Sequence, residues 1–278
     1  MAVTDDAPRT PWWRRWAGGH ERTTGNPPSA NGASSLHLGW VLPPLPSPVV
    51  AVEVTLEVLE PPTVPRLYFW ALQADFGDDR GRRAGGAHLG LQWYPAHPGS
   101  TAVNWGGYRA TGGELDGTPS ALPSATGNPN TRDLAWRPHV PYRLAVRRVP
   151  GGPGPVAWRG GLTGADVAEV VVRDLLADGD RITGVTMWSE VFARCDHPSV
   201  AVRWSDPRVL LEDGTTTAPE RVVTSYQSHA DGGCANTAST VDGVGLVQRT
   251  CAERTTAAGT SLVVPRWSPE GGGRGEQA

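Results

Sequence analysis

The chain has 278 residues, 38% of them hydrophobic, and a formal net charge of −3. This length and apolar content suffice for one large core, whereas the charge provides no electrostatic footprint for nucleic acid. No apolar run reaches the roughly 18 residues of a transmembrane helix, so neither nucleic acid nor membrane is expected as a partner. Residues 1–16 lack the apolar stretch of a secretory signal. This predicts a cytoplasmic protein, with secretion possible if the true start lies upstream.

The predicted elements are short strands separated by turns, because 35 glycines and 26 prolines leave little room for long helices. The clearest strand signal is the alternation of apolar and polar residues over 50–59. Further strands are predicted, in chain order, at Ser35–Val41, Arg66–Phe76, Ala87–Tyr94, Thr101–Tyr108, Tyr142–Val149, Val156–Gly161, Ile182–Cys195, Val200–Trp204, Arg208–Leu211 and Gly243–Arg249. Asp166–Leu176 could form a short amphipathic helix, but its valine run favours a strand. The spacing predicts an all-β sandwich or jelly roll.

We expect one jelly-roll domain over residues 32–267, between an irregular segment, 1–31, and a disordered tail, 268–278. The tryptophan cluster Trp12–Trp16 either packs back on the sandwich, which we favour, or forms a partner surface. The sequence does not indicate an oligomeric state.

The three cysteines, Cys195, Cys234 and Cys251, are odd in number and lack metal-ligand spacing. At most one intrachain disulfide can form, and Cys234 with Cys251 is the candidate pair. Three reduced thiols fit the sequence about as well, and better if the chain stays in the cytosol.

Residues 184–195 have two different faces when they are read as a strand. One face resembles a core and consists of Val185, Met187, Ser189, Val191, Ala193 and Cys195. The other mixes aromatic and charged groups, namely Thr186, Trp188, Glu190, Phe192 and Arg194. The side chains of this second face can stack on a polar ligand and form hydrogen bonds with it. The alternatives are a structural ion pair between Glu190 and Arg194, and a Trp188 that belongs to the core.

Other segments add polar candidates to the same surface. Strand parity places His88, Gln92 and Tyr94 on one side of 87–94, and Asn104 on the polar side of 101–108. The segment 225–236 could overhang the surface as a loop that carries His229, Asp231 and Asn236, although Asp231-Gly232-Gly233 is also an ordinary turn signal. His88 alone would more often be a structural histidine. Aromatic rings can stack on the C–H faces of sugars, and amide and carboxylate groups can form hydrogen bonds with sugar hydroxyls.

Several pieces of the sequence occur in a recognisable order. They are Tyr68-Phe69-Trp70 with Asp75-Phe76, Gly86-Ala87-His88-Leu89-Gly90-Leu91-Gln92, Tyr142-Arg143-Leu144, Trp188-Ser189-Glu190 and Gly232-Gly233-Cys234-Ala235-Asn236-Thr237. In this order the chain resembles a bacterial family of unknown function with a concanavalin A-like jelly-roll domain, from about Trp40 to Arg249. The resemblance implies a two-sheet sandwich with one concave face. In the wider lectin and glucanase superfamily that shape commonly holds carbohydrate.

The best-known hydrolases of that superfamily carry acidic residues at alternate positions of one strand, but here Phe192 and Arg194 follow Glu190 at those positions. A retaining glycosidase needs a second carboxylate about 5–5.5 Å from the first, so a partner acid would have to come from elsewhere. The candidate catalytic residues are therefore Glu190 as acid/base, Asp231 and Asp75.

No cofactor motif is present, so no cofactor is expected. The loop Asp75–Arg83 could ligate calcium through its three aspartates, but its arginines compensate that charge, and we expect no metal site.

We therefore expect a protein that binds carbohydrate, a glycoconjugate or another small polar ligand through an aromatic and polar concave sheet face. The alternative is an enzyme on the same scaffold, either a glycoside hydrolase or lyase or an enzyme acting on a small polar metabolite. A third possibility is an interaction protein whose contact site is Trp12–Trp16.

Overall fold

The structure is a computed structural model that describes residues 21–265, except 152, 153 and 166. The Trp12–Trp16 cluster and the predicted tail, 268–278, lie outside the described residues. Residues 21–33 contain no strand and run along the sandwich, where Arg22 donates to the Gly233 carbonyl and Cys195 donates to the Gly25 carbonyl. The predicted domain boundaries stay a prediction.

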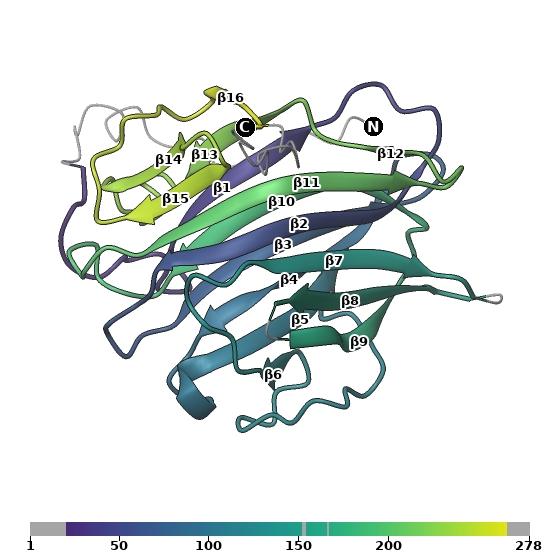
Figure 1. The fold of residues 1–278 in the computed structure, drawn as a ribbon, viewed down its shortest axis with the longest axis horizontal. Helices are drawn as coiled ribbons and strands as arrows, with labels where there is room; N and C mark the ends of the chain where they lie inside the picture. The colour runs from purple at the N-terminus through teal and green to yellow at the C-terminus, as the bar shows by residue number, and fades with distance from the viewer. Residues whose placement is uncertain (1–20, 152–153, 166, 266–278) are drawn as a thin grey trace, which may run out of the picture.

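Within the described chain the regular elements are antiparallel strands and one short 3-10 turn, η2 (Pro98–Ser100) (Figure 1). The strands are β1 (Ser34–Val41), β2 (Val49–Glu60), β3 (Tyr68–Gly77), β4 (Arg83–Trp93), β5 (Thr101–Arg109), β6 (Thr131–Asp133), β7 (Tyr142–Val149), β8 (Val156–Gly164), β9 (Val167–Ala177), β10 (Arg181–Val191), β11 (Ala201–Leu211), β12 (Thr216–Thr217), β13 (Arg221–Tyr226), β14 (Thr237–Val241), β15 (Leu246–Thr250) and β16 (Ser261–Val263). None of the described residues forms a helix of the length and hydropathy needed to cross a membrane.

The strands form two sheets that meet at one residue pair. The first sheet has the order β16-β13-β1-β10-β3-β4-β5-β6, and the second has the order β14-β15-β11-β2-β7-β8-β9 with β12 beside β11. Ile182 of β10 pairs with Val49 of β2 and joins the two sheets. The all-β, two-sheet sandwich predicted from the sequence is confirmed.

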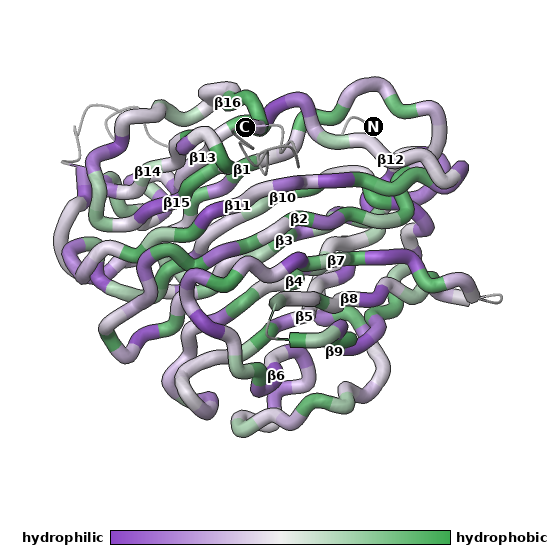
Figure 2. Tube along the Cα trace, in the orientation of Figure 1, coloured by the Kyte–Doolittle hydropathy of each residue, from purple (hydrophilic) through white to green (hydrophobic). Residues whose placement is uncertain are grey.

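The core lies between the two sheets, and its largest fully buried side chains are aromatic. Figure 2 shows the hydrophobic and hydrophilic segments that alternate along the strands, as expected when alternate side chains face the core. Phe76 of β3 stacks on Trp158 of β8 with 4.6 Å between ring centroids. Gly160 of β8 lies so close to Trp105 that a Cβ atom added at Gly160 would come within 2.5 Å of the indole ring. A glycine is needed at this position for the strand to approach the ring so closely.

Several of the sequence predictions can be compared directly with the strands. Residues Val167–Ala177 form β9, so the favoured strand is confirmed and the short helix is wrong. The two strands predicted at 200–204 and 208–211 form one strand, β11, whose register shifts between Ser205 and Arg208. Five of the described strands, β6, β12, β13, β14 and β16, were not predicted. Each has at most six residues, which is too short for a clear alternating pattern.

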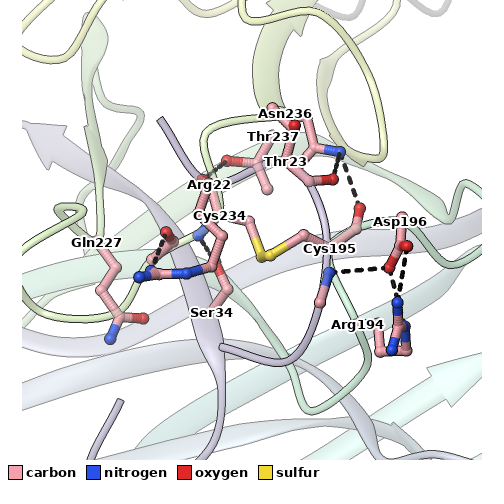
Figure 3. Close-up of a disulfide and its surroundings, with 12 residues drawn as sticks. Arg22, Thr23, Ser34, Arg194, Cys195, Asp196, Gln227, Cys234, Asn236 and Thr237 are labelled. Atoms are coloured by element: carbon pink, nitrogen blue, oxygen red, sulfur yellow. Dashed lines mark hydrogen bonds and ion pairs between the residues drawn. A yellow bond between two sulfur atoms is a disulfide. The ribbon is translucent and has the colours of Figure 1, made fainter. Parts of the chain in front are cut away.

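Cys195 forms the disulfide with Cys234, and Cys251 is free and exposed (Figure 3). The predicted pairing of Cys234 with Cys251 is therefore wrong. The loop after β10 lies beside the loop before β14, and the Cα atoms of the two disulfide-bonded cysteines are 5.6 Å apart. Asn236 Nδ2 donates to the Cys195 carbonyl at 2.8 Å, and the Cys234 amide donates to Ser34 Oγ at 2.9 Å. These contacts bring together cysteines that are distant in sequence.

Candidate functional site

The outward side of the first sheet, called here the outer face, carries the predicted site. Residues that pair across neighbouring strands point to the same side of a sheet. One row, the Glu190 row, consists of Ser35, Glu190, Phe69, Gln92, Ala102 and Asp133. The next row, the Trp188 row, consists of His37, Trp188, Ala71, Gly90, Asn104 and Thr131. The register thus brings together side chains from six strands.

The parity of β10 places Trp188 and Glu190 on the outer face. All six residues of the predicted core-like side of 184–195 are buried, so that side is confirmed. Because β10 ends at Val191, strand parity does not extend to Phe192 and Arg194. Arg194 instead pairs with Asp196, with 3.0 Å between Nη2 and Oδ2. The alternative of an ion pair between Glu190 and Arg194 is therefore wrong.

The carboxyl of Glu190 is partly buried and has an amide as its hydrogen-bond partner. Asn31 Nδ2 donates to Glu190 Oε1 at 2.7 Å, and Asn31 Oδ1 accepts from the Ala33 amide at 3.1 Å, which fixes the orientation of the Asn31 side chain. Burial raises the pKa of Glu190 above its ordinary value, and the Asn31 hydrogen bond opposes this only in part. Every other described carboxyl with a shifted pKa has it lowered, mostly through arginine or backbone N–H partners. An unneutralised carboxyl of this kind suggests a functional site.

Three rings pack against one another beside Glu190. Trp188 contacts Phe69 at 4.9 Å and His88 at 5.6 Å between centroids, in edge-to-face geometry. Trp188 is only 8% exposed and Phe69 only 5%. The predicted aromatic surface is therefore a packed floor of the outer face rather than an open stacking platform. Burial also lowers the pKa of His88 to about 4, so its imidazole is neutral near pH 7.

Two buried amides complete the central part of the outer face. Gln92 is 6% exposed and Asn104 is 7% exposed. Asn104 Nδ2 donates to Thr131 Oγ1 at 2.8 Å, while Asn104 Oδ1 and Trp188 Nε1 have no hydrogen-bond partner within the described chain. Gln92 lies two strands from Glu190, which corresponds to about 10 Å between Cα atoms. The structure thus places Glu190, Trp188, His88, Gln92 and Asn104 together.

The other two candidate carboxylates lie apart from this group. Asp75 is six residues from Phe69 along β3, about 20 Å along the sheet. It accepts from Gln73 Nε2 at 3.1 Å and pairs with Arg83 at 3.4 Å. Asp231 is exposed and accepts from Ser228 Oγ at 2.6 Å. No contact within the described chain joins either carboxylate to Glu190.

The segment 225–236 borders the outer face at Ser35, whose amide donates to Gln227 Oε1 at 3.0 Å. His229 is exposed in this segment. Asn236 instead lies beside the disulfide, where it holds the Cys195 carbonyl (Figure 3). The structure therefore assigns Asn236 a structural contact, and shows no contact between His229 and the central residues.

The sequence analysis missed a group of loop residues at the β6 end of the Glu190 row. His97 Nδ1 lies 2.5 Å from Asp133 Oδ1, and His97 Nε2 lies 3.5 Å from Thr126 Oγ1. The ring of Tyr94, a predicted ligand-binding residue, is 5.3 Å from His97 between centroids. His97 and Thr126 come from separate loops and Asp133 from the end of the short strand β6, so no fixed spacing in the sequence could have identified them.

The outward side of the second sheet has a different chemistry. Arginines and carboxylates form linked ion pairs there, including Arg143 with Glu53 at 2.7 Å, and Arg203 with both Glu57 at 2.8 Å and Asp242 at 2.7 Å. The Glu190 and Trp188 rows contain no arginine. Among the described residues, no three His, Cys, Asp or Glu side chains cluster so that they could hold a metal ion.

No family model and no curated protein matches the sequence, so the resemblance to a bacterial family stays a prediction. Among solved structures, the chain is similar to scytalido-glutamic peptidase with a transition-state analogue inhibitor, at 12% identity and a TM-score of 0.42, over 78% of this chain and 98% of that one. It is also similar to a peptidase of the eqolisin family in complex with a tripeptide, at 10% identity and a TM-score of 0.42, with the same coverage. An alginate lyase in complex with an alginate trisaccharide has 8% identity and a TM-score of 0.22, over 62% of this chain and 77% of that one.

Proposed function

We propose that the outer face of the first sheet binds a carbohydrate or glycoconjugate. The observation that carries this proposal is the contrast between the two outward surfaces. The second sheet presents the linked ion pairs of an ordinary solvated surface. The Glu190 and Trp188 rows instead present two amides, two hydroxyls, a histidine and two aromatic rings, with the carboxyls of Glu190 and Asp133 and no arginine.

Uncharged groups of this kind suit a ligand rich in hydroxyls. The amides of Gln92 and Asn104 can both donate and accept, as sugar hydroxyls do. Two tyrosines offer open rings at the margins of the same face: Tyr108 of β5, which is 56% exposed, and Tyr94 at the end of β4, which is partly exposed. Such rings can pack against the C–H faces of a sugar.

Calorimetry with soluble saccharides, chosen from a glycan array, tests this proposal. We expect binding that weakens at least tenfold in Tyr94→Ala and Gln92→Leu, because each removes a ligand contact worth about 1.4 kcal/mol or more. Thr163→Val, on the outward side of the second sheet, is the matched control and should leave the affinity unchanged. Absence of binding by the wild-type protein at millimolar saccharide would contradict the proposal.

The second candidate is an enzyme on the same face with Glu190 as general acid/base, and the raised pKa of Glu190 favours it. Glu190→Gln keeps the shape and the acceptor for Asn31 but cannot transfer a proton. An enzyme should lose at least a hundredfold in turnover and retain its ligand, whereas a binding protein should change only in affinity. Unchanged turnover in this variant would exclude Glu190 from the chemistry.

A further inference from the structure

Thr126, His97 and Asp133 form a continuous hydrogen-bonded series at the end of the outer face. The distance from Thr126 Oγ1 to His97 Nε2 is 3.5 Å, and that from His97 Nδ1 to Asp133 Oδ1 is 2.5 Å. A hydroxyl, an imidazole and a carboxylate in this order are the groups of a nucleophile, its base and the residue that orients the base. The Thr126 hydroxyl lies at the outer limit of hydrogen-bond reach from His97, a distance that is often long before substrate binds, and it also lies 3.3 Å from Ser124 Oγ.

The hydrogen bonds define which nitrogen of His97 carries the proton. Asp133 Oδ1 also accepts from the Ala125 amide at 3.1 Å. The His97 hydrogen bond is the main reason that the pKa of Asp133 is lowered, so this carboxyl is ionised and can only accept. His97 Nδ1 must therefore donate to Asp133, and in the neutral ring Nε2 presents its lone pair to the Thr126 hydroxyl. This is the tautomer that a general base requires.

Exposure and rigidity support the same assignment. The His97 side chain is fully buried, whereas Thr126 is exposed, so a substrate can reach the hydroxyl while the base behind it is shielded from water. The turn that carries His97 is held by backbone hydrogen bonds from Tyr94 to the Ser100 carbonyl at 2.7 Å and from Ser100 to the His97 carbonyl at 2.9 Å. A catalytic group needs a position fixed in this way.

The series belongs to the proposed ligand face because Asp133 is a member of the Glu190 row. It pairs with Ala102, which in turn pairs with Gln92. Tyr94 lies beside His97 and supplies a ring for the ligand at this end. A carbohydrate on the outer face would therefore extend toward the Thr126 hydroxyl.

We propose that Thr126, His97 and Asp133 form a nucleophilic triad that hydrolyses acyl esters carried by a carbohydrate ligand. The choice of a carbohydrate as the alcohol part rests on the function proposed above, whereas the ester chemistry rests on the triad alone.

In the first step Thr126 Oγ forms a bond to the ester carbonyl carbon, and its proton passes to His97 Nε2. The C–O bond to the sugar then breaks, and the leaving oxygen takes that proton. This gives the free sugar hydroxyl and an acyl-threonine ester.

In the second step His97 acts as the base again: it takes a proton from water while the water oxygen attacks the acyl-threonine carbonyl, and returns that proton to Thr126 Oγ as the acyl bond breaks. This releases a carboxylic acid and restores the threonine hydroxyl. The net reaction is ester plus water to alcohol plus acid. Asp133 is a positioning residue in both steps.

Hydrolysis of 4-nitrophenyl acetate tests the triad without a sugar. We expect the wild-type protein to hydrolyse it well above the buffer rate and Thr126→Val to lose at least a hundredfold. Thr126→Ser, which keeps a hydroxyl, should retain at least a tenth of the activity. Thr216→Val, at another exposed threonine, is the control and should match the wild type. A fluorophosphonate probe should label residue 126, as located by mass spectrometry.

Wild-type hydrolysis at the buffer rate, full activity of Thr126→Val, or labelling at a different residue would each overturn the triad. Calorimetry of Thr126→Val with an unacylated saccharide separates this proposal from the proposed function. If the saccharide still binds while ester hydrolysis is absent even in the wild type, only the triad fails. If no saccharide binds while Thr126-dependent hydrolysis persists, the triad stands and the carbohydrate specificity fails.

Discussion

At the scale of single residues, the central part of the outer face is distinguished by two titratable side chains, Glu190 and His88, that form no ion pair within the described chain. Glu190 is held by the Asn31 amide, and its pKa is raised by burial. His88 lies between the rings of Phe69 and Trp188, and its pKa is lowered by burial. Both shifts have the same cause, which is that burial disfavours the charged form of each side chain.

The titration of His88 predicts how acid affects stability. The pKa of His88 is about 4 in the folded protein and 6.5 in its ordinary state. As the pH falls below 6.5, the unfolded chain binds a proton that the folded chain does not, so the free energy of unfolding decreases down to about pH 4. The full effect of this group is roughly 3 kcal/mol.

Urea unfolding at pH 7 and pH 4.5 measures this loss. We expect His88→Gln to lose clearly less stability than the wild type between the two pH values, because glutamine does not titrate. His229→Gln, at an exposed histidine, should behave like the wild type. His37 contributes to the loss in all three proteins, since burial also lowers its pKa. An equal loss in wild type and His88→Gln would show that His88 is not the source.

At the scale of elements, β10 shows how much of the site could be predicted from the sequence. Within β10, the alternation over 185–191 correctly predicts which side chains turn away from the outer face, because a period of two is a local property of the chain. Where the strand ends is decided by hydrogen bonds to neighbouring strands, which stop at Val191. Arg194 was therefore predicted to lie beside Glu190, whereas it lies in the following turn and pairs with Asp196.

The parity of β10 predicts opposite results for two adjacent residues. Met187 is fully buried between the sheets, so Met187→Ala should lower the free energy of unfolding by about 2–5 kcal/mol. Thr186 points to the outer face and is partly exposed, so Thr186→Ala should cost less than about 1 kcal/mol. Chemical denaturation of both variants measures the difference. Similar losses in the two variants would contradict the assigned parity.

The rows across the sheet could not be predicted, because they depend on the order and register of strands that are distant in sequence. The sequence indicated the polar sides of several strands, and these include Gln92 and Asn104. It did not indicate that β10, β3 and β4 are neighbours, which is what places Gln92 near Glu190. The approach of Thr126 to His97 depends in addition on turns whose paths have no periodic signal in the sequence.

At the scale of the whole molecule, the two outward surfaces differ in their chemistry. The ion pairs of the second sheet connect β2, β7 and β11 across their solvent side, as between Arg143, Glu53 and Asp206. The Glu190 and Trp188 rows of the first sheet contain no arginine, and the segments around 21–33 and 225–236 contact this side through Asn31 and Gln227. The Cys195–Cys234 disulfide joins the β10–β11 loop to the β13–β14 loop at the edge of this side. Such a bond persists in oxidising compartments, whereas the sequence analysis predicts a cytoplasmic protein, and that localisation stays a prediction.

The stability of the whole fold should depend on this disulfide. The bonded cysteines are 39 residues apart, and closing a loop of this length stabilises the folded state by about 4 kcal/mol in the chain-entropy model. We expect reduction by dithiothreitol, or the double substitution Cys195→Ala with Cys234→Ala, to lower the free energy of unfolding by an amount of that order. Cys251→Ser is the control and should leave stability unchanged, since Cys251 is exposed and unpaired. If reduction and the double substitution leave the free energy of unfolding unchanged, the disulfide does not stabilise the fold. If Cys251→Ser destabilises the protein as much as reduction does, the pairing involves Cys251 instead.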